Sequence, residues 1–222
     1  PIAERLAAAV ADGDTGYSAD ADGLRDIVSQ YYTRYGVESA PGDVMPVYDV
    51  GVGVRAALAE FVPSGGRVVH HVPVYMPFPG WIRRAGHEPA PVPFAEDGGI
   101  NLPAIEAELA AGARAVLLCH PHNPTGRVWT PEELERLRDL AMKYDLFVMS
   151  DELHADLRYE GRAFESFAAD PRVQARTVTV TGPCKAFNTA GLGIGAMISH
   201  DADLVARVRG AAGGLMGHPA AL

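Results

Sequence analysis

Short, uninterrupted apolar runs alternate with helix patterns along this chain, and the alternation limits its possible folds more than any other feature. The runs lack polar alternation, which is typical of strands covered on both faces. Between them, Thr130 and Glu133 form a capping box, and Asn101 begins a second helix that Gly112 ends. We therefore expect a three-layer α/β fold, a mostly parallel sheet with helices on both faces. The expected strands lie at 68–69, 115–118, 146–149, 178–180 and 194–198.

Length and charge narrow the class of protein. The 222 residues are 48% hydrophobic, which allows one sizeable core, so a single domain over residues 1–222 is expected. The chain has 19 basic and 28 acidic side chains, a net charge of −9, and no basic block, which disfavours a nucleic-acid partner. Cys119 and Cys184 form no disulfide framework, so a cytoplasmic setting is expected. No apolar run approaches the length that spans a membrane.

Three polar residues follow three of the expected strands. Asn123 comes after the strand that ends near Cys119, Asp151 follows Met149, and Lys185 follows Val180. In an open sheet of this kind, ligands bind outside the carboxyl ends of the strands. A lysine, a carboxylate and an amide at one such edge are groups that a lysine-bound pyridoxal phosphate needs.

Two glycines lie where an extended segment meets an expected helix. In the run 48–54, Gly51 and Gly53 allow exposed backbone amides to surround an anion at the helix start. Taken alone, such a pair is as typical of a tight turn.

Longer motifs resemble the pyridoxal-phosphate enzymes of fold type I, aminotransferase class I/II, and within them the cystathionine or cysteine-S-conjugate β-lyase branch. The resemblance covers nearly the whole chain. Family members are longer at both ends, so the resemblance implies a large, cofactor-binding domain without the amino-terminal segment and the carboxyl-terminal small domain. The motifs are Gly-Tyr-Ser at 16–18, Asp-Val at 49–50, Pro-Val-Tyr-Met-Pro-Phe at 73–78, Asn-Pro-Thr-Gly at 123–126, Asp-Glu-Leu-His at 151–154 and Lys-Ala-Phe-Asn-Thr-Ala-Gly-Leu at 185–192.

The resemblance implies pyridoxal 5'-phosphate as cofactor and assigns roles to the polar residues. Lys185 forms the Schiff base and then acts as the base at the substrate α-carbon. Asp151 keeps the pyridine nitrogen protonated, so that the ring accepts electrons. Asn123 donates to the phenolic oxygen, and Tyr75 stacks on the ring. His154 lies near the ring, without a defined role.

The phosphate is expected to bind mostly to main chain. Relatives commonly carry serine at two positions where this chain has Gly182 and Cys184, which predicts weaker cofactor binding unless Thr181 compensates. Each lost hydrogen bond to a charged group corresponds to roughly 1.5–3 kcal/mol. The backbone amides expected at the phosphate are those of Val50, Gly51 and Val52.

Tyr17 resembles the tyrosine that, in the family, reaches the phosphate of the neighbouring subunit. A homodimer with a shared active site is therefore implied. The expected activity is cleavage of cystathionine or a cysteine S-conjugate to a thiol, pyruvate and ammonia. An aminotransferase shares every step as far as the carbanion and is the alternative enzyme.

Two hypotheses of other classes remain open. The chain could be a non-catalytic module that binds the cofactor or a partner protein without turnover. The spacing of Cys119, His120 and His122 would also suit a zinc site, although no fourth ligand is apparent.

Overall fold

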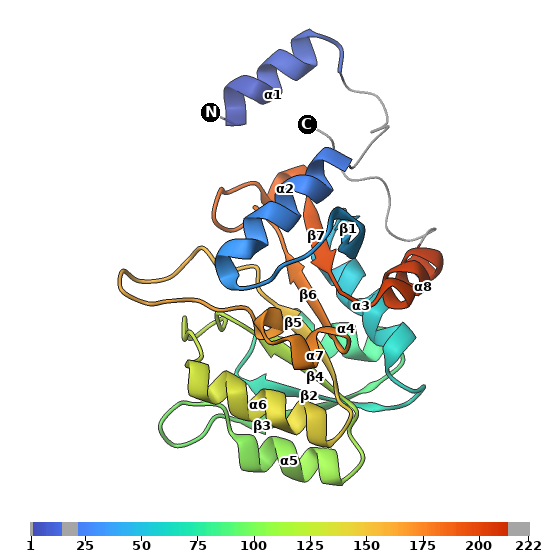
Figure 1. Ribbon diagram of the computed structural model, residues 1–222, viewed down its shortest axis with the longest axis vertical. Coiled ribbons are helices and arrows are strands. Elements are labelled where there is room, and N and C mark those ends of the chain that lie inside the picture. The colour runs from blue at the N-terminus through green and yellow to red at the C-terminus, as the bar shows by residue number, and fades with distance from the viewer. Residues whose placement is uncertain (1, 15–21, 213–222) are drawn as a thin grey trace.

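A seven-stranded sheet forms the centre of the computed structural model, which describes residues 2–14 and 22–212 (Figure 1). The strand order is β1-β7-β6-β5-β4-β2-β3. Only β7 runs antiparallel to its neighbours, and the other pairs are parallel, so the predicted mostly parallel sheet is confirmed. The strands are β1 (Val44–Val47), β2 (Arg67–Val72), β3 (Glu88–Pro93), β4 (Ala115–Cys119), β5 (Phe147–Asp151), β6 (Thr177–Thr181) and β7 (Gly195–Ile198).

The two strands that the sequence did not reveal lie at the two edges of the sheet. Three of the six residues of β3 are proline, and β1 contains Pro46. Proline has no N–H for the ladder and is tolerated at an edge, where one side of the strand needs no partner. The expected strands were the central ones, with uninterrupted apolar runs.

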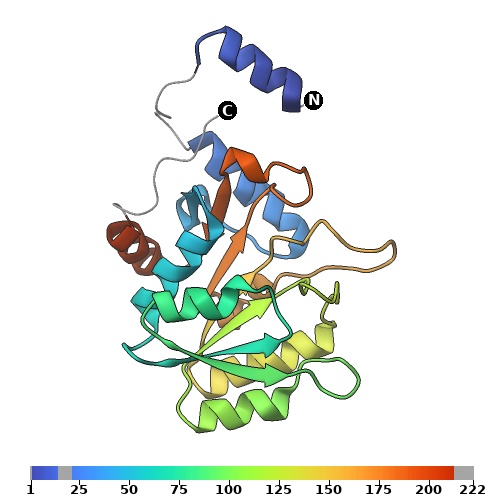
Figure 2. The same cartoon turned by 180° about the vertical axis from the view of Figure 1, so that it is seen from behind.

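Helices cover both faces and complete the three layers. α5 and α6 pack on one face of the sheet, and α3, α4 and α8 pack on the other. Figure 2 shows the molecule from the side of α3, α4 and α8. A third apolar cluster joins α2 to β1 and β7. The helices are α1 (Ile2–Ala11), α2 (Asp22–Tyr32), α3 (Val50–Phe61), α4 (Pro77–Arg84), α5 (Leu102–Ala110), α6 (Pro131–Lys143), α7 (Pro171–Gln174) and α8 (Ala202–Ala212), with short 3₁₀ turns at Thr33–Tyr35, Pro41–Asp43, Phe167–Ala169 and Ala190–Leu192.

The helix starts read from the sequence are confirmed. The Asn101 side chain accepts the N–H of Ala104 at 3.1 Å at the start of α5. At α6, Thr130 Oγ1 accepts the N–H of Glu133 at 3.2 Å, and Glu133 Oε2 accepts the N–H of Thr130 at 2.8 Å. Each bond satisfies an N–H that has no partner inside the helix.

The sheet brings the three candidate strand ends together. Cys119 at the end of β4 pairs with Asp151 at the end of β5, and Asp151 pairs with Val180 near the end of β6. Among the described helices, none is long and apolar enough to cross a membrane.

Candidate functional site

A cavity of about 160 Å³ opens at this edge, between the ends of β4, β5 and β6 and the start of α3. Its walls come from segments far apart in the sequence, as expected for a ligand site in an open α/β sheet. Seven of the residues expected at the site line it: Val50, Gly51, Tyr75, Asn123, Asp151, His154 and Lys185.

Asp151 forms the buried end of the cavity. It is 5% exposed, and its Oδ1 accepts the N–H of Leu153 at 3.2 Å. Burial raises the pKa of Asp151 to about 6, although this N–H and the charge of Lys185 act in the opposite direction. Within the described ranges it forms no ion pair, so a bound cation would compensate its burial.

Lys185 lies in the turn that follows β6. Two backbone bonds hold this turn, from the Phe187 N–H to the Pro183 oxygen at 2.9 Å and from the Thr189 N–H to the Cys184 oxygen at 3.1 Å. The Lys185 charge adds to burial in lowering the pKa of His154. A primary amine therefore stands near both a carboxylate and an imidazole.

Asn123 begins the turn after β4. Its N–H donates to Cys119 Sγ at 3.3 Å, and the Gly126 N–H closes the turn on the His122 oxygen at 2.7 Å. The Asn123 side chain lines the cavity and offers an amide donor there.

Two aromatic side chains form one wall. Tyr75 and Trp81 meet edge to face, with ring centroids 5.8 Å apart and an interplanar angle of 71°. Phe78 packs behind Trp81 at 5.6 Å. Trp81 was not among the expected site residues, yet it lies one helical turn beyond Phe78, so the helical period of the 73–78 motif carried that signal.

The start of α3 forms one end of the cavity. Asp49 caps the helix, and its Oδ1 accepts the N–H of Val52 at 2.9 Å. The Val52 amide, expected at the phosphate, is therefore already bonded and does not line the cavity. Among the described residues, nothing accepts the N–H of Val50 or Gly51.

Thr181 and Tyr17 do not join this group. Val178 and Val180 face the α3 side of the sheet, so the alternation of the strand places Thr181 on the opposite side. There it lines a separate groove of about 260 Å³ with Tyr32 and Phe187. Tyr17 lies outside the described residues.

The residues of the rival zinc hypothesis have other partners. His120 Nε2 bonds to the Glu165 oxygen at 3.0 Å, and His122 Nδ1 bonds to Thr125 Oγ1 at 3.0 Å. In residues 2–14 and 22–212, no three His, Cys, Asp or Glu side chains gather closely enough to hold a metal ion.

The residues of the cavity fit a flat cofactor with a cationic ring nitrogen, an aldehyde and a phosphate. Asp151 is a buried carboxylate that forms no ion pair in the described chain, Lys185 supplies an amine, and Tyr75 supplies an aromatic face. The free amides at the start of α3 supply anion donors. Pyridoxal phosphate has all these complementary groups.

Comparison with known proteins agrees with this fit. A cystathionine beta-lyase from Corynebacterium glutamicum is 35% identical over 192 residues, 86% of this chain and 51% of that protein. A putative aminotransferase, YugH, from Bacillus subtilis (strain 168) is 33% identical over 190 residues, 82% of this chain and 49% of that protein. The chain thus spans about half the length of these relatives.

A solved structure shares the fold. The crystal structure of cystalysin from Treponema denticola, which contains a pyridoxal 5'-phosphate cofactor, superposes with a TM-score of 0.86 at 30% identity, over 92% of this chain and 53% of that one. The family described as aminotransferase class I and II matches residues 8–222. Because this match covers nearly the whole chain, the protein belongs to the aminotransferase class I and II family.

Proposed function

We propose that residues 1–222 are the cofactor-binding large domain of a pyridoxal-phosphate-dependent carbon–sulfur β-lyase. Its substrates would be cystathionine or a cysteine S-conjugate, and its products a thiol, pyruvate and ammonia. The observation that carries the proposal is that Asp151 and Lys185, from the ends of adjacent strands, line one cavity. Relatives named cystathionine beta-lyase and cystalysin support the substrate class.

Lys185 is the residue that would hold the cofactor and move a proton. Lys185 belongs to the turn after β6 and lines the cavity, and the charge of its amine lowers the pKa of Asp151. In its neutral form this amine accepts a proton from the substrate α-carbon. The cofactor supplies an aromatic ring that accepts the electrons left on that carbon.

Asp151 would hold a proton on the ring nitrogen. A carboxylate that is desolvated by burial gains most from a cation beside it, so the ionised form of Asp151 and a protonated pyridine stabilise each other. Leu153 also lines the cavity, and its N–H donates to Asp151 Oδ1. Asn123, which also lines the cavity, would donate to the phenolic oxygen.

An aminotransferase is the second candidate, because the putative aminotransferase is 33% identical, nearly as similar as the lyase. Both reactions need the same lysine, carboxylate and amide. They differ in whether a β-substituent leaves or a proton is returned elsewhere.

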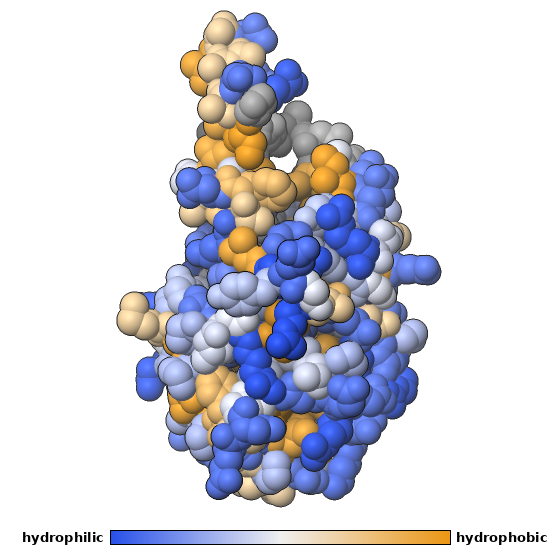
Figure 3. Space-filling view, turned by 90° about the vertical axis from the view of Figure 1, so that its left-hand side faces the viewer, coloured by the Kyte–Doolittle hydropathy of each residue, from blue (hydrophilic) through white to orange (hydrophobic). Residues whose placement is uncertain are grey.

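We also propose a cytoplasmic homodimer with an active site shared between subunits. α1 has no buried residue, and Ile2 and Val10 on it are 45% and 61% exposed. Apolar side chains gather on this projecting part of the molecule (Figure 3), which favours a partner surface. Both described cysteines are free, as is usual in a reducing compartment.

Spectroscopy and product analysis test the proposal. The protein mixed with pyridoxal phosphate should show the visible absorption of a lysine-bound cofactor, and Lys185→Ala should not. Full-length protein should then release pyruvate from cystathionine without a keto acid. Pyruvate only when 2-oxoglutarate is present would favour the aminotransferase, and absorption without turnover of either substrate would indicate a non-catalytic module.

A further inference from the structure

The phosphate end of the cavity is poor in the usual anion-binding side chains. Among the described residues that line it, Lys185 carries the only lysine or arginine charge, and the Asp49 carboxylate stands at the helix start. Gly182 and Cys184, which precede Lys185 in the turn after β6, bring no hydroxyl group to this end. A dianionic phosphate here would depend on neutral N–H donors.

Trp81 lies directly against this helix start. A Cβ atom built on Gly51 would be 2.6 Å from Cε2 and Cζ2 of the Trp81 ring and 2.9 Å from its Nε1. Only glycine therefore permits the ring in this position. Both residues line the cavity, and the ring edge that approaches Gly51 is the edge that carries the N–H.

The two tryptophans of the chain differ in what their N–H groups do. Trp129 is 2% exposed, and its Nε1 donates to the Cys119 oxygen at 2.9 Å. Within the described chain, Trp81 Nε1 has no acceptor, although indole nitrogen can only donate. Packing against Phe78 and Tyr75 fixes the ring, so an acceptor beside Gly51 would meet a preoriented donor.

We infer that Trp81 Nε1–H donates a hydrogen bond to the cofactor phosphate. The inference rests on the proposed function, since it assigns one more residue to the same site. Gly51 then has two roles: its amide faces the anion, and its missing side chain admits the indole.

Trp81→Phe tests this donor, because phenylalanine keeps an aromatic ring and removes the N–H. Dissociation constants of pyridoxal phosphate and of pyridoxal, which lacks the phosphate, are measured by absorption titration for both proteins. Trp81→Phe should weaken pyridoxal phosphate about tenfold, equivalent to about 1.4 kcal/mol. Pyridoxal should bind both proteins equally.

Two results would overturn the inference: equal weakening for both ligands, which indicates a packing role, or no weakening for either. Gly51→Ala gives a second approach, since its methyl group displaces the indole. Gly51→Ala should weaken the binding of pyridoxal phosphate when Trp81 is present, and much less when it is combined with Trp81→Val. If the wild type shows no Lys185-dependent absorption, the proposed function itself fails, and the inference with it.

Discussion

Asp151 and Glu152 are adjacent buried carboxyl groups with opposite surroundings. Asp151 faces the cavity, and the described chain gives its carboxylate one hydrogen bond, from the Leu153 N–H. Glu152, fully buried, faces the other side of the sheet. Its Oε1 accepts from Ser150 Oγ at 2.9 Å, Ser166 Oγ at 2.9 Å and the Phe167 N–H at 3.1 Å.

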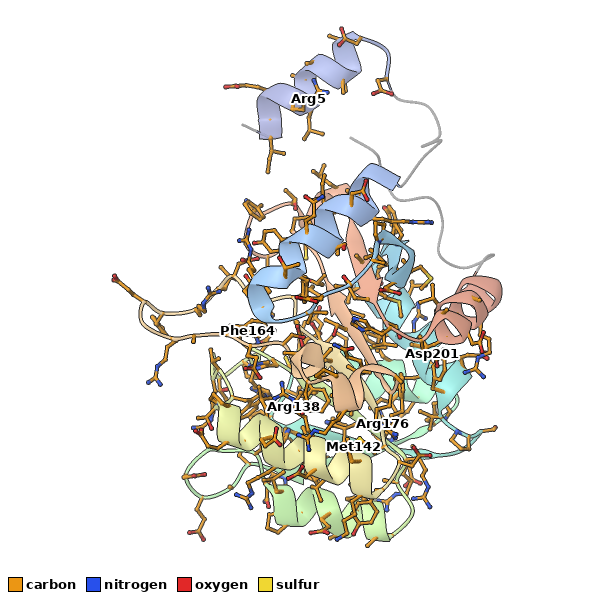
Figure 4. The ribbon with its side chains drawn as sticks, viewed as in Figure 1. Arg5, Arg138, Met142, Phe164, Arg176 and Asp201 are labelled. Atoms are coloured by element: carbon orange, nitrogen blue, oxygen red, sulfur yellow. The ribbon has the colours of Figure 1, made fainter. Side chains whose placement is uncertain are left out.

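The segment that surrounds Glu152 is itself fixed. Arg138 of α6 donates from Nε to the Phe167 oxygen at 3.1 Å and from Nη2 to the Ser166 oxygen and Glu165 Oε1, both at 2.8 Å (Figure 4). Glu152 therefore has three donors on Oε1, although its buried Oε2 has no partner in the described chain, whereas Asp151 has one donor and faces the cavity. Burial of a carboxyl group alone therefore does not mark a functional carboxylate; a buried carboxylate that faces a cavity and has few donors does.

Asp151→Asn should produce the largest effect. It removes the charge that stabilises a protonated ring nitrogen, so lyase turnover should fall about a thousandfold, equivalent to roughly 4 kcal/mol. The free energy of unfolding without cofactor should not fall, because no described ion pair is broken and burial already penalises the ionised carboxylate. Pyruvate release and urea unfolding measure the two quantities. Unchanged turnover would remove Asp151 from the site.

Glu152→Ala should show the reverse pattern. It leaves two hydroxyls and the Phe167 N–H without their buried acceptor, so the free energy of unfolding at pH 5 should fall by about 3 kcal/mol. Affinity for pyridoxal phosphate should change less than twofold in the fraction that is folded. If Glu152→Ala loses the cofactor while keeping its stability, the assignment of the two carboxyls is inverted.

The arrangement of the strands explains which parts of the site could be predicted from the sequence. Order and strand ends in the sequence indicated Asp151, Asn123 and Lys185, because parallel strands end at one edge. They could not indicate that Thr181 faces away, since that depends on the register of β6 within the sheet. They also did not indicate that the Val52 N–H donates to Asp49 Oδ1. At this helix start the Asp49 carboxylate and a bound phosphate would be alternative acceptors for that N–H.

The strands of the sheet differ in the same way: the central strands could be predicted from the sequence, and the edge strands could not. Central strands are apolar because helices cover both faces, so their sequence alone reveals them. The edges of the sheet do not need apolar runs, and β3 and β1 were missed for that reason. Trp81 lines the cavity where α4 meets α3. The helical period of the 73–78 motif indicated its side of α4, whereas the contact of that side with Gly51 depends on how α4 packs against α3.

Burial of these carboxyl groups also makes the stability of the fold depend on pH. Burial raises the pKa of Glu152 from 4.5 to about 7 in the folded protein, so its contribution to stability is present at low pH and is lost as pH rises through about 7. Histidines such as His122, whose pKa burial lowers to about 4, act in the opposite direction. A matched variant, Glu152→Gln, removes the carboxyl titration and keeps theirs.

Relative to the wild type, Glu152→Gln should therefore gain about 2–3 kcal/mol of unfolding free energy between pH 5 and pH 8. Urea unfolding at several pH values measures this difference. Asp151→Asn should show a smaller gain, centred lower, because the pKa of Asp151 rises only to about 6. A difference that stays constant with pH would mean that Glu152 is ionised throughout this range.

The smallest expected effect on stability comes from the hydroxyl of Ser150, which is compared with the neighbouring hydroxyl of Thr179. Ser150→Ala removes a single hydrogen bond to Glu152 and should lower the free energy of unfolding by about 1 kcal/mol. Thr179, paired with Ser150 in the β5–β6 register, is the matched control, because its buried hydroxyl has no partner within the described chain. Thr179→Val keeps the shape, removes that hydroxyl and should be neutral or stabilising by up to about 1 kcal/mol. Urea unfolding at pH 5 measures both variants. Equal losses of unfolding free energy would show that general packing of this face, rather than the hydrogen bonds to Glu152, stabilises the surroundings of Glu152.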